Sequence, residues 1–186
     1  QTDSHGKRQG GVVRYGVPGL EALLDDYIQP LKDADQGNHA KNLYNSYLYF
    51  WRWATWQVTE LPRGPGVIAL ITASSFLTGP SFGGIRKHIR ENFDDVWIID
   101  LGGDGRGTQE SDDNVFDILT PVTITICARS TDTSETEASV HYTRLQGRRE
   151  EKLDTLSVAA MSDLDWIDVR GTNLDPFVPL SESTYH

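Results

Sequence analysis

The chain has 186 residues, of which 38% are hydrophobic and 24% charged, a composition typical of one folded globular domain and not of a disordered segment. Its net charge of -10 is uneven, because residues 1–93 hold 10 Lys/Arg against 8 Asp/Glu and residues 94–186 hold 7 against 19. This balance argues against a compact basic nucleic-acid module, although local DNA contacts in the first half stay open. No apolar run approaches the ~20 residues of a membrane helix, which argues against a membrane-spanning protein.

The cysteine and methionine content and the N-terminal residues indicate the cellular location of the chain and whether it is part of a longer protein. The single cysteine, Cys127, excludes internal disulfides and fits a reducing, cytoplasmic location. Residues 1–11 are polar and do not resemble a signal peptide. Because the only methionine is Met161, we expect the chain to be a piece of a longer protein.

The first third of the chain predicts a loop followed by two helices. Residues 1–19 are rich in glycine and basic side chains and predict an irregular loop. Apolar residues at helical spacing over residues 20–31 predict a first helix. A second helix is predicted over residues 41–60, with a broad aromatic face, and the Pro- and Gly-rich residues 61–66 end it.

The middle of the chain predicts a strand–helix–strand unit. Residues 67–72 and 96–101 are short continuous apolar runs, the pattern of strands covered on both faces. Residues 84–92 between them predict a helix, with Ile85, His88 and Ile89 facing inward.

Two further strands, a helix and a tail are predicted after residue 120. The strands cover residues 122–127 and 138–145. A helix is predicted over residues 148–160, with Leu153, Leu156 and Ala160 on one apolar side. A short strand and a loose tail complete the chain. The predicted fold class is α/β, with a mostly parallel sheet that looks incomplete.

The glycine-rich loop after residue 101 has two possible functions and one structural interpretation. Its glycines resemble a phosphate-binding loop, but no helix signal follows and its acidic residues would repel anions, so a surface loop is favoured. The acidic residues could instead bind a hard cation, but their spacing matches no calcium loop and a solvated turn is favoured. These acidic residues are Asp104, Glu110, Asp112 and Asp113.

Other reactive side chains stand alone in the sequence. The five histidines lack a second ligand three or four residues away, so no metal site is predicted. Ser74 and Ser75 follow a strand but lack a nucleophile elbow, and Cys127 is interpreted as a core residue. The aromatic helix is interpreted as core packing; alternatively, Tyr44 and Asn45 at its start face a ligand at the sheet edge.

Several segments, in this order, resemble the adenine-N6 DNA methyltransferase domain of type ISP restriction–modification enzymes and related large bacterial DNA methyltransferases. They are KNLYN at residues 41–45, YFWRWA at 49–54, GVIALITASSFL at 66–77, GIRKH at 84–88, IIDLGG at 98–103, NVFDI at 114–118 and RREEKL at 148–153. The resemblance covers roughly residues 40–170.

The resemblance implies a fold and a division of the chain. The fold would be the C-terminal half of a Rossmann-like S-adenosylmethionine-dependent methyltransferase sheet, mostly parallel with an antiparallel last strand at residues 122–127. Residues 1–19 would be an irregular loop, residues 20–170 a partial methyltransferase domain, and residues 171–186 a tail or linker to a downstream domain.

The resemblance also implies a reaction, which is methyl transfer from S-adenosylmethionine to the amine of an adenine flipped out of duplex DNA. The family's catalytic tetrapeptide, of the Asn/Asp-Pro-Pro-Tyr type, is absent from this chain, as is the cofactor's glycine-rich first-strand loop. We therefore expect no catalytic residue here, both motifs upstream in a longer protein, and an inactive isolated chain. The longer protein would be a bacterial restriction–modification or phage-defence enzyme, with a helicase or nuclease domain and a DNA-specificity module.

Ligand contacts are implied residue by residue. Cofactor contacts fall on Leu43 and Tyr44, the target-base side on Ser74, Ser75 and Phe76, and DNA contacts on Lys7, Arg8, Arg14 and Tyr15. The family's stacking aromatic at the seventh strand has no equivalent at residues 127–129. Two alternatives stay open: a non-catalytic remnant that serves as a DNA-binding or scaffold module, and a methyltransferase that acts on RNA or protein.

Overall fold

The computed structural model describes residues 9–61, 64–103, 112–130 and 137–179. The helices are α1 (Gly11–Tyr15), α2 (Asp25–Asp33), α3 (Ser46–Thr59), α4 (Gly83–Asn92) and α5 (Arg149–Val158). The strands are β1 (Gly66–Ala73), β2 (Asp95–Asp100), β3 (Val122–Arg129), β4 (Ser139–Arg144) and β5 (Ile167–Asp168). Short 3₁₀ helices cover Gly37–Leu43, Ser74–Leu77, Pro80–Phe82 and Met161–Asp163.

The described strands form one mixed sheet in the order β1-β3-β2-β4-β5. Strand β3 is antiparallel to both β1 and β2, so β1 and β2 run in the same direction with β3 inserted between them. Strand β4 is parallel to β2, and β5 is antiparallel to β4. The α/β class is confirmed, but neighbouring strands are mostly antiparallel, and the antiparallel β3 is not the last strand.

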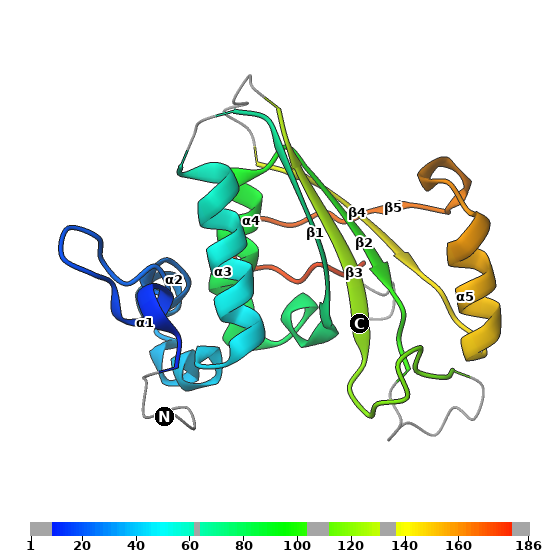
Figure 1. The fold of residues 1–186 in the computed structure, drawn as a ribbon, viewed down its shortest axis with the longest axis horizontal. Helices are drawn as coiled ribbons and strands as arrows, with labels where there is room; N and C mark the ends of the chain where they lie inside the picture. Colours follow the sequence, from blue (N-terminus) through cyan, green and yellow to red (C-terminus); the bar gives the residue numbers. More distant parts are fainter. Residues whose placement is uncertain (1–8, 62–63, 104–111, 131–136, 180–186) are drawn as a thin grey trace, which may run out of the picture.

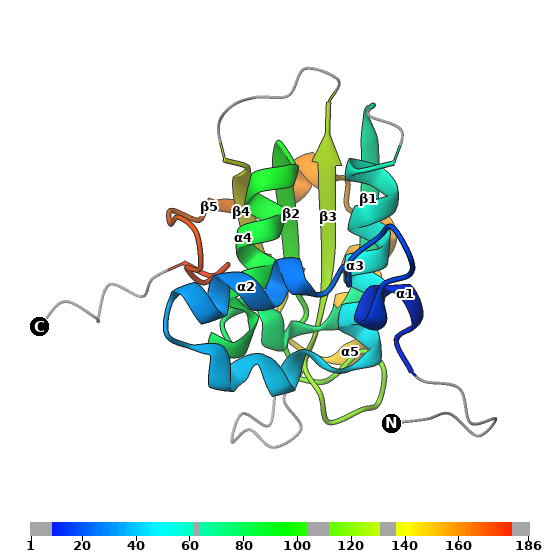
Figure 2. The same cartoon turned by 90° about the vertical axis from the view of Figure 1, so that its left-hand side faces the viewer.

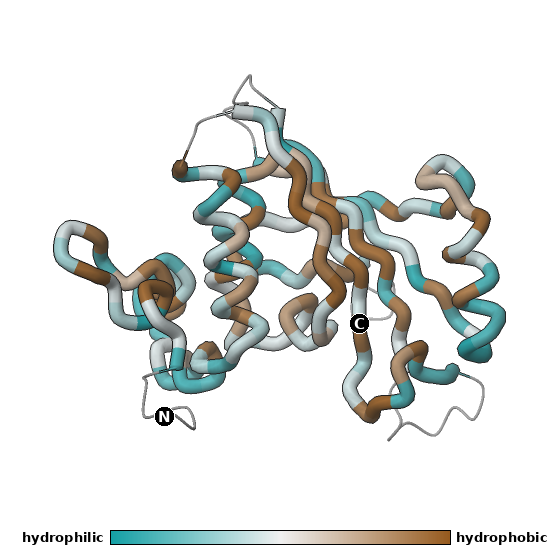
Figure 3. The backbone as a smooth tube through the Cα atoms, in the orientation of Figure 1, coloured by the Kyte–Doolittle hydropathy of each residue, from teal (hydrophilic) through white to brown (hydrophobic). Residues whose placement is uncertain are grey.

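Helices lie on both faces of this sheet. Helices α3 and α4 lie side by side over one face, and α5 lies on the other (Figures 1 and 2). Helix α2 packs against α4, and α1 packs against α3. The larger core fills the space between the sheet and α3 and α4, with Trp51, Ile85, Ile89 and Ile98 fully buried. Hydrophobic residues follow the strands through the centre of the molecule (Figure 3).

Strand β1 is an edge strand with one uncovered face, which corrects the expectation of a strand buried on both faces. Among the described residues, only β3 pairs with it. Ile68 on the helix side is 5% exposed, whereas Val67 and Ile71 on the opposite side are 65% and 54% exposed. A continuous apolar run is typical of a strand that is covered on both faces. The described residues cover only one face of β1.

Helices α2 and α3 each begin about five residues later than predicted, for local reasons. The stretch before α2 contains a turn closed by a bridge between Val17 and Leu20. Helix α3 begins at Ser46 because the side chain of Asn45 accepts a hydrogen bond from the amide of Leu48 at 3.1 Å, which is an N-cap. Residues 9–19 are also not fully irregular, since they include the short helix α1.

The C-terminal part differs from the prediction in two respects. Helix α5 buries Lys152 most deeply, whereas Leu153 is 44% exposed and Ala160 is exposed. The described residues after 170 are not a loose tail, because Phe177 is fully buried against Phe76. Its amide also donates to the carbonyl oxygen of Leu77 at 2.8 Å.

Candidate functional site

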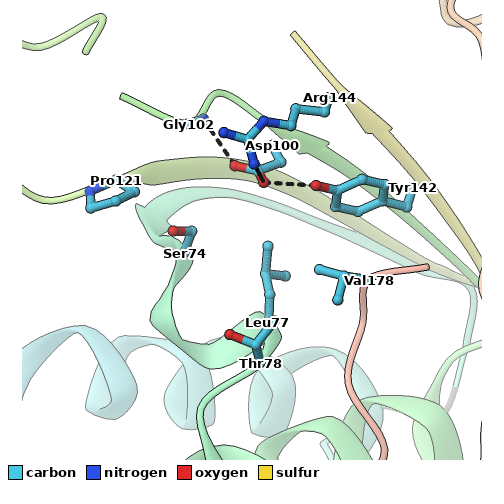
Figure 4. Close-up of a pocket in the computed structure, with 9 residues that line it drawn as sticks. All are labelled: Ser74, Leu77, Thr78, Asp100, Gly102, Pro121, Tyr142, Arg144 and Val178. Carbon is cyan, nitrogen blue, oxygen red and sulfur yellow. Dashed lines mark hydrogen bonds and ion pairs between the residues drawn. The ribbon is translucent and has the colours of Figure 1, made fainter. Parts of the chain in front are cut away.

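Strands β1, β2 and β4 run in the same direction, so their carboxyl ends lie at the same end of the sheet, with β3 between β1 and β2. Ser74 directly follows β1, Asp100 is the last residue of β2, and Arg144 is the last residue of β4. Open α/β sheets commonly bind ligands beyond such carboxyl ends. A cavity of about 460 Å³ lies here, the strand-end pocket, lined by Ser74, Leu77, Thr78, Asp100, Gly102, Pro121, Tyr142, Arg144 and Val178 (Figure 4).

The carboxylate of Asp100 organises the polar side of the strand-end pocket. Its Oδ1 accepts a hydrogen bond from the amide of Gly102 at 2.9 Å, and its Oδ2 accepts one from the hydroxyl of Tyr142 at 2.7 Å. The guanidinium of Arg144 lies 3.6 Å from the same Oδ2. Gly102 has a φ of 55°, a left-handed conformation that favours glycine at this turn.

Tyr142 and Arg144 each keep one charge state near neutral pH. Burial and the neighbouring Asp100 carboxylate raise the pKa of the Tyr142 phenol above its ordinary value of 10.0, so Tyr142 stays a neutral donor. Burial works to lower the pKa of Arg144, but the carboxylates of Asp100 and Asp112 outweigh it and the pKa is raised. Arg144 therefore stays a cation.

A chain of alternating charges connects the pocket to α5. The Nη2 of Arg144 lies 3.2 Å from Oδ2 of Asp112, and the other oxygen of Asp112 accepts a hydrogen bond from Nζ of Lys152 at 2.5 Å. The Lys152 ammonium also donates to the carbonyl oxygens of Leu101 at 2.6 Å and Asp113 at 2.7 Å. Three acceptors thus satisfy a cation that is fully buried.

These contacts involve two of the acidic residues that were weighed as ligands of a hard cation, where a solvated turn was favoured. Asp112 is paired with Lys152 and Arg144, and the carboxylate of Asp113 accepts a hydrogen bond from the amide of Arg149 at 3.3 Å. Asp104 and Glu110 lie outside the described residues. Within the described part of the chain, no group of three or more acidic, histidine or cysteine side chains could hold a metal ion.

Of the three residues predicted on the target-base side, only Ser74 lines the strand-end pocket. The hydroxyl of Ser75 forms a hydrogen bond with the hydroxyl of Tyr47 at 3.1 Å. Phe76 is fully buried, with its ring centroid 5.4 Å from that of Trp51. Its side chain belongs to the core because Phe76 lies in the 3₁₀ helix after β1 and packs against Trp51 of α3.

The two predicted cofactor residues have different environments. Leu43 is fully buried in the larger core, so its side chain is not available to a ligand. Tyr44 is 41% exposed, and the guanidinium of Arg14 lies 4.5 Å from its ring centroid. Of the two predicted cofactor residues, only Tyr44 therefore exposes its side chain.

The predicted DNA-binding residues lie beside Tyr44 where they are described. Arg14 is also 5.1 Å from the ring centroid of Tyr15, which is 42% exposed. A shallow groove of about 310 Å³ runs alongside, lined by residues 10–13, Ser46, Tyr49, Phe50 and Trp53. Lys7 and Arg8 lie outside the described residues. The structure thus brings together Arg14, Tyr15 and Tyr44, for which the sequence predicts two separate roles.

The sequence prediction did not include Asp100, Tyr142 and Arg144 among the site residues. The available signal was their position, because Asp100 and Arg144 each end a strand where ligands commonly bind. A second unpredicted feature is the turn before β3. The side-chain Nδ2 of Asn114 donates to the carbonyl oxygens of Gly103 at 3.2 Å and Thr120 at 2.7 Å, and this turn presents Phe116, which is 49% exposed.

The fold and the strand-end pocket define a mixed α/β protein with a polar site at the carboxyl ends of its strands. Models of protein families give no match, and neither do curated proteins. Solved structures do match: the Type ISP restriction–modification enzyme LlaGI, as a nuclease-deletion mutant with a DNA substrate mimic, is 26% identical with a TM-score of 0.68. The DNA-bound Type ISP enzyme LlaBIII gives 26% and 0.66, and the DrdV–DNA complex gives 26% and 0.64.

These alignments cover most of this chain and little of the others. They include 83% of this chain for LlaGI and LlaBIII and 77% for DrdV, but only 15%, 10% and 14% of those chains, respectively. The chain is thus similar to one part of a Type ISP restriction–modification enzyme. No helix in the described ranges has the length and apolar character needed to cross a membrane.

Proposed function

We propose that this chain is the C-terminal part of an adenine-N6 DNA methyltransferase domain within a bacterial restriction–modification or phage-defence enzyme. The observation that carries the proposal is the similarity of 83% of the chain to two Type ISP enzymes, one bound to DNA and one to a DNA substrate mimic. The order of the similar segments in the sequence supports the methyltransferase domain in particular. In this proposal the longer protein acts on DNA and also carries a helicase or nuclease domain and a specificity module.

The uncovered side of β1 supports a place within a larger sheet. Among the described residues no strand pairs with its outer edge, and Val67 and Ile71 are exposed; proteins usually cover such features with further structure. We infer that another part of the longer protein pairs with β1 and carries the catalytic tetrapeptide. S-adenosylmethionine would supply the methyl group, and most of its contacts would come from that part, with Tyr44 as an edge contact.

The strand-end pocket supplies the target-base side in this proposal. Ser74 and Tyr142 offer hydroxyl groups and Arg144 a fixed cation, which suit the polar edge of a base. Phe116 is an exposed aromatic ring on a turn that hydrogen bonds hold beside Gly103, so it suits stacking on a flipped base. We infer that it takes the place of the aromatic expected near residue 127. Catalysis would then depend on alignment of the base rather than on an acid or base in this chain.

The test is methyl transfer in the longer protein that contains this chain. Labelled S-adenosylmethionine and duplex DNA are the substrates, and the variant Ser74→Leu fills the pocket. We expect methylation to fall at least about tenfold with a retained fold, because the base would be displaced from alignment. Ser162→Leu, at an exposed position in the 3₁₀ helix Met161–Asp163, should keep wild-type activity.

Two outcomes contradict the proposal. Equal methylation by the wild type and Ser74→Leu would show that the strand-end pocket takes no part in methyl transfer. DNA binding by the wild type without methylation of any DNA would favour the non-catalytic binding module.

A further inference from the structure

Arg86 of α4 is a buried cation whose hydrogen-bond partners are backbone carbonyl oxygens. The residue is 3% exposed. Its Nη1 donates to the carbonyl oxygens of Phe76 at 2.8 Å and Gly79 at 2.9 Å. Its Nε donates to those of Leu174 at 3.0 Å and Asp175 at 2.9 Å, and its Nη2 donates to that of Leu174 at 2.7 Å. One side chain therefore joins two segments that lie more than 90 residues apart in the sequence.

Both segments line the strand-end pocket. Residues 74–79 contribute Ser74, Leu77 and Thr78 to its lining, and residues 173–178 contribute Val178 (Figure 4). They also touch directly, since the amide of Phe177 donates to the carbonyl oxygen of Leu77 at 2.8 Å. The wall of the pocket on the α4 side thus consists of two chain segments that meet at Arg86.

Arg90, one turn further along α4, is a natural comparison. It is 1% exposed and donates to the carbonyl oxygens of Asn173 at 3.0 Å, Asp175 at 2.9 Å and Pro176 at 3.2 Å. Its guanidinium also lies 4.5 Å from the ring centroid of Phe177. All of these contacts go to residues 173–178, so Arg90 anchors one of the two segments and Arg86 anchors both.

The geometry requires an arginine at this position. A guanidinium offers five N–H donors in a fixed plane, whereas a lysine ammonium offers three from one point. Burial, and then the nearby charge of Arg90, lowers the pKa of Arg86 to about 10, and Asp175 partly opposes this. The side chain is still charged at neutral pH, so its hydrogen bonds to the carbonyl oxygens are charge-assisted.

We propose that Arg86 is a positioning residue for the strand-end pocket, which holds residues 74–79 and 173–178 as one wall so that Ser74 and Val178 keep a fixed separation. The segment after residue 170 is then part of the site. The proposal deepens the proposed function and rests on it only for the identity of the ligand, because the joining of the two segments is a property of the fold itself.

Amide hydrogen exchange in the purified 186-residue chain tests the joining without any ligand. The reporters are the amide of Gly79, bonded to the carbonyl of Ser75, and the amide of Phe177, with the amides of β3 as the reference for global unfolding. We expect Arg86→Lys to speed exchange at both reporters at least about tenfold relative to β3, through loss of charge-assisted hydrogen bonds. Arg90→Lys should speed exchange at both reporters by less than about threefold, because Arg86 still joins the two segments.

The proposal is overturned if Arg86→Lys leaves Gly79 unchanged, or if it speeds all amides equally with β3, which is the pattern of a purely structural residue. If Arg86→Lys does not fold, amide exchange of the wild type in increasing urea tests whether the two segments open together. A joined wall predicts one opening free energy and one urea dependence for Gly79 and Phe177, and two separate values contradict it.

Methyl transfer by the longer protein separates this proposal from the proposed function. We expect Arg86→Lys to lower kcat/KM for DNA about tenfold, and Arg90→Lys, compared at equal loss of thermal stability, to lower it less than about threefold. If the wild type shows the exchange pattern but transfers no methyl group, the proposed function fails and the joined wall stands. If methyl transfer occurs and the two variants are equally active, the positioning role of Arg86 is refuted.

Discussion

The hydroxyl of Tyr142 donates a hydrogen bond to Oδ2 of Asp100 over 2.7 Å, between two strands that run in parallel. In the register of this pair Asp100 lies opposite Arg144 and Ile98 lies opposite Tyr142. Asp100, Tyr142 and Arg144 therefore occupy the same face, where the carboxylate bridges the other two side chains. A slip of one residue would turn one strand's side chains to the other face, so the register of β2 and β4 forms the polar side of the pocket.

The Tyr142–Asp100 hydrogen bond predicts a response to alkaline pH. Since the folded pKa of Tyr142 is raised above 10.0, its stabilising effect is complete below about pH 10 and is lost as pH rises toward the folded pKa. We expect the free energy of unfolding of Tyr142→Phe to be about 1–2 kcal/mol lower than that of the wild type at pH 8. Between pH 8 and pH 11, the free energy of unfolding should fall less in the variant than in the wild type. Urea unfolding followed by circular dichroism at both pH values measures this. An equal alkaline loss in both proteins would contradict it.

Lys152 predicts a large loss of stability from a residue on a surface helix. Lys152→Met removes three hydrogen bonds and leaves Asp112 with Arg144 as its remaining charged partner. We expect the free energy of unfolding to fall by about 2–4 kcal/mol. Glu150→Gln, exposed on the same helix, should stay within about 0.5 kcal/mol of the wild type. Similar values for the two variants in thermal or urea unfolding would contradict the role of Lys152.

Asp112 predicts part of the response to acid. Burial opposes its ionisation, but hydrogen bonds from Lys152 and from the amide of Gly103 outweigh this and lower its pKa below 3.8. Its contribution is therefore complete above the unfolded pKa and is lost as pH falls through the folded pKa. We expect Asp112→Asn to be less stable than the wild type at pH 7 and to lose less stability between pH 5 and pH 3. Parallel stability curves for the two proteins would show that this carboxylate is not responsible.

Gly84 predicts a steric requirement where α4 meets α2. A Cβ at this position would overlap the carbonyl oxygen of Tyr27, which is main-chain and cannot move aside alone. We expect Gly84→Ala to cost about 3 kcal/mol. Gly64→Ala is the matched control, because a Cβ there meets open space, and its effect should stay within about 0.5 kcal/mol. Melting temperatures give the comparison, and a Gly84→Ala protein as stable as the control would disprove the contact.

Arg14 predicts a salt effect in the longer protein. If its guanidinium contacts a DNA phosphate, Arg14→Ala should reduce the slope of log K against log salt by about one. Tyr44→Leu removes the ring beneath Arg14 but keeps the charge, so its slope should match that of the wild type. Fluorescence anisotropy with a labelled duplex at several salt concentrations provides both slopes. A slope unchanged by Arg14→Ala would leave that side chain with a packing role only.

Elements with a strong local pattern were predicted well. The helix expected over residues 84–92 is α4 with Ile85, His88 and Ile89 buried, and the strands expected at 96–101 and 122–127 differ from β2 and β3 by one or two residues. Their apolar periodicity reports burial directly. The predicted start of α3 was too early because Leu43 extends the four-residue spacing of Tyr47 and Trp51, whereas the cap at Asn45 sets the boundary.

The sequence by itself determined the α/β class, the positions of the strands and the resemblance to a methyltransferase domain, because local spacing and segment order carry that information. The tertiary structure decided which side chains meet. Asp100 and Tyr142 are 42 residues apart and Arg86 and Leu174 are 88 apart, and each pair forms only after the sheet has set its register and α4 has packed. In the tertiary structure Leu43 and Phe76 also lie in the core, and Ser74 lines the pocket. Pairing between distant polar groups leaves no periodic trace in the chain, so only the packed structure reveals it.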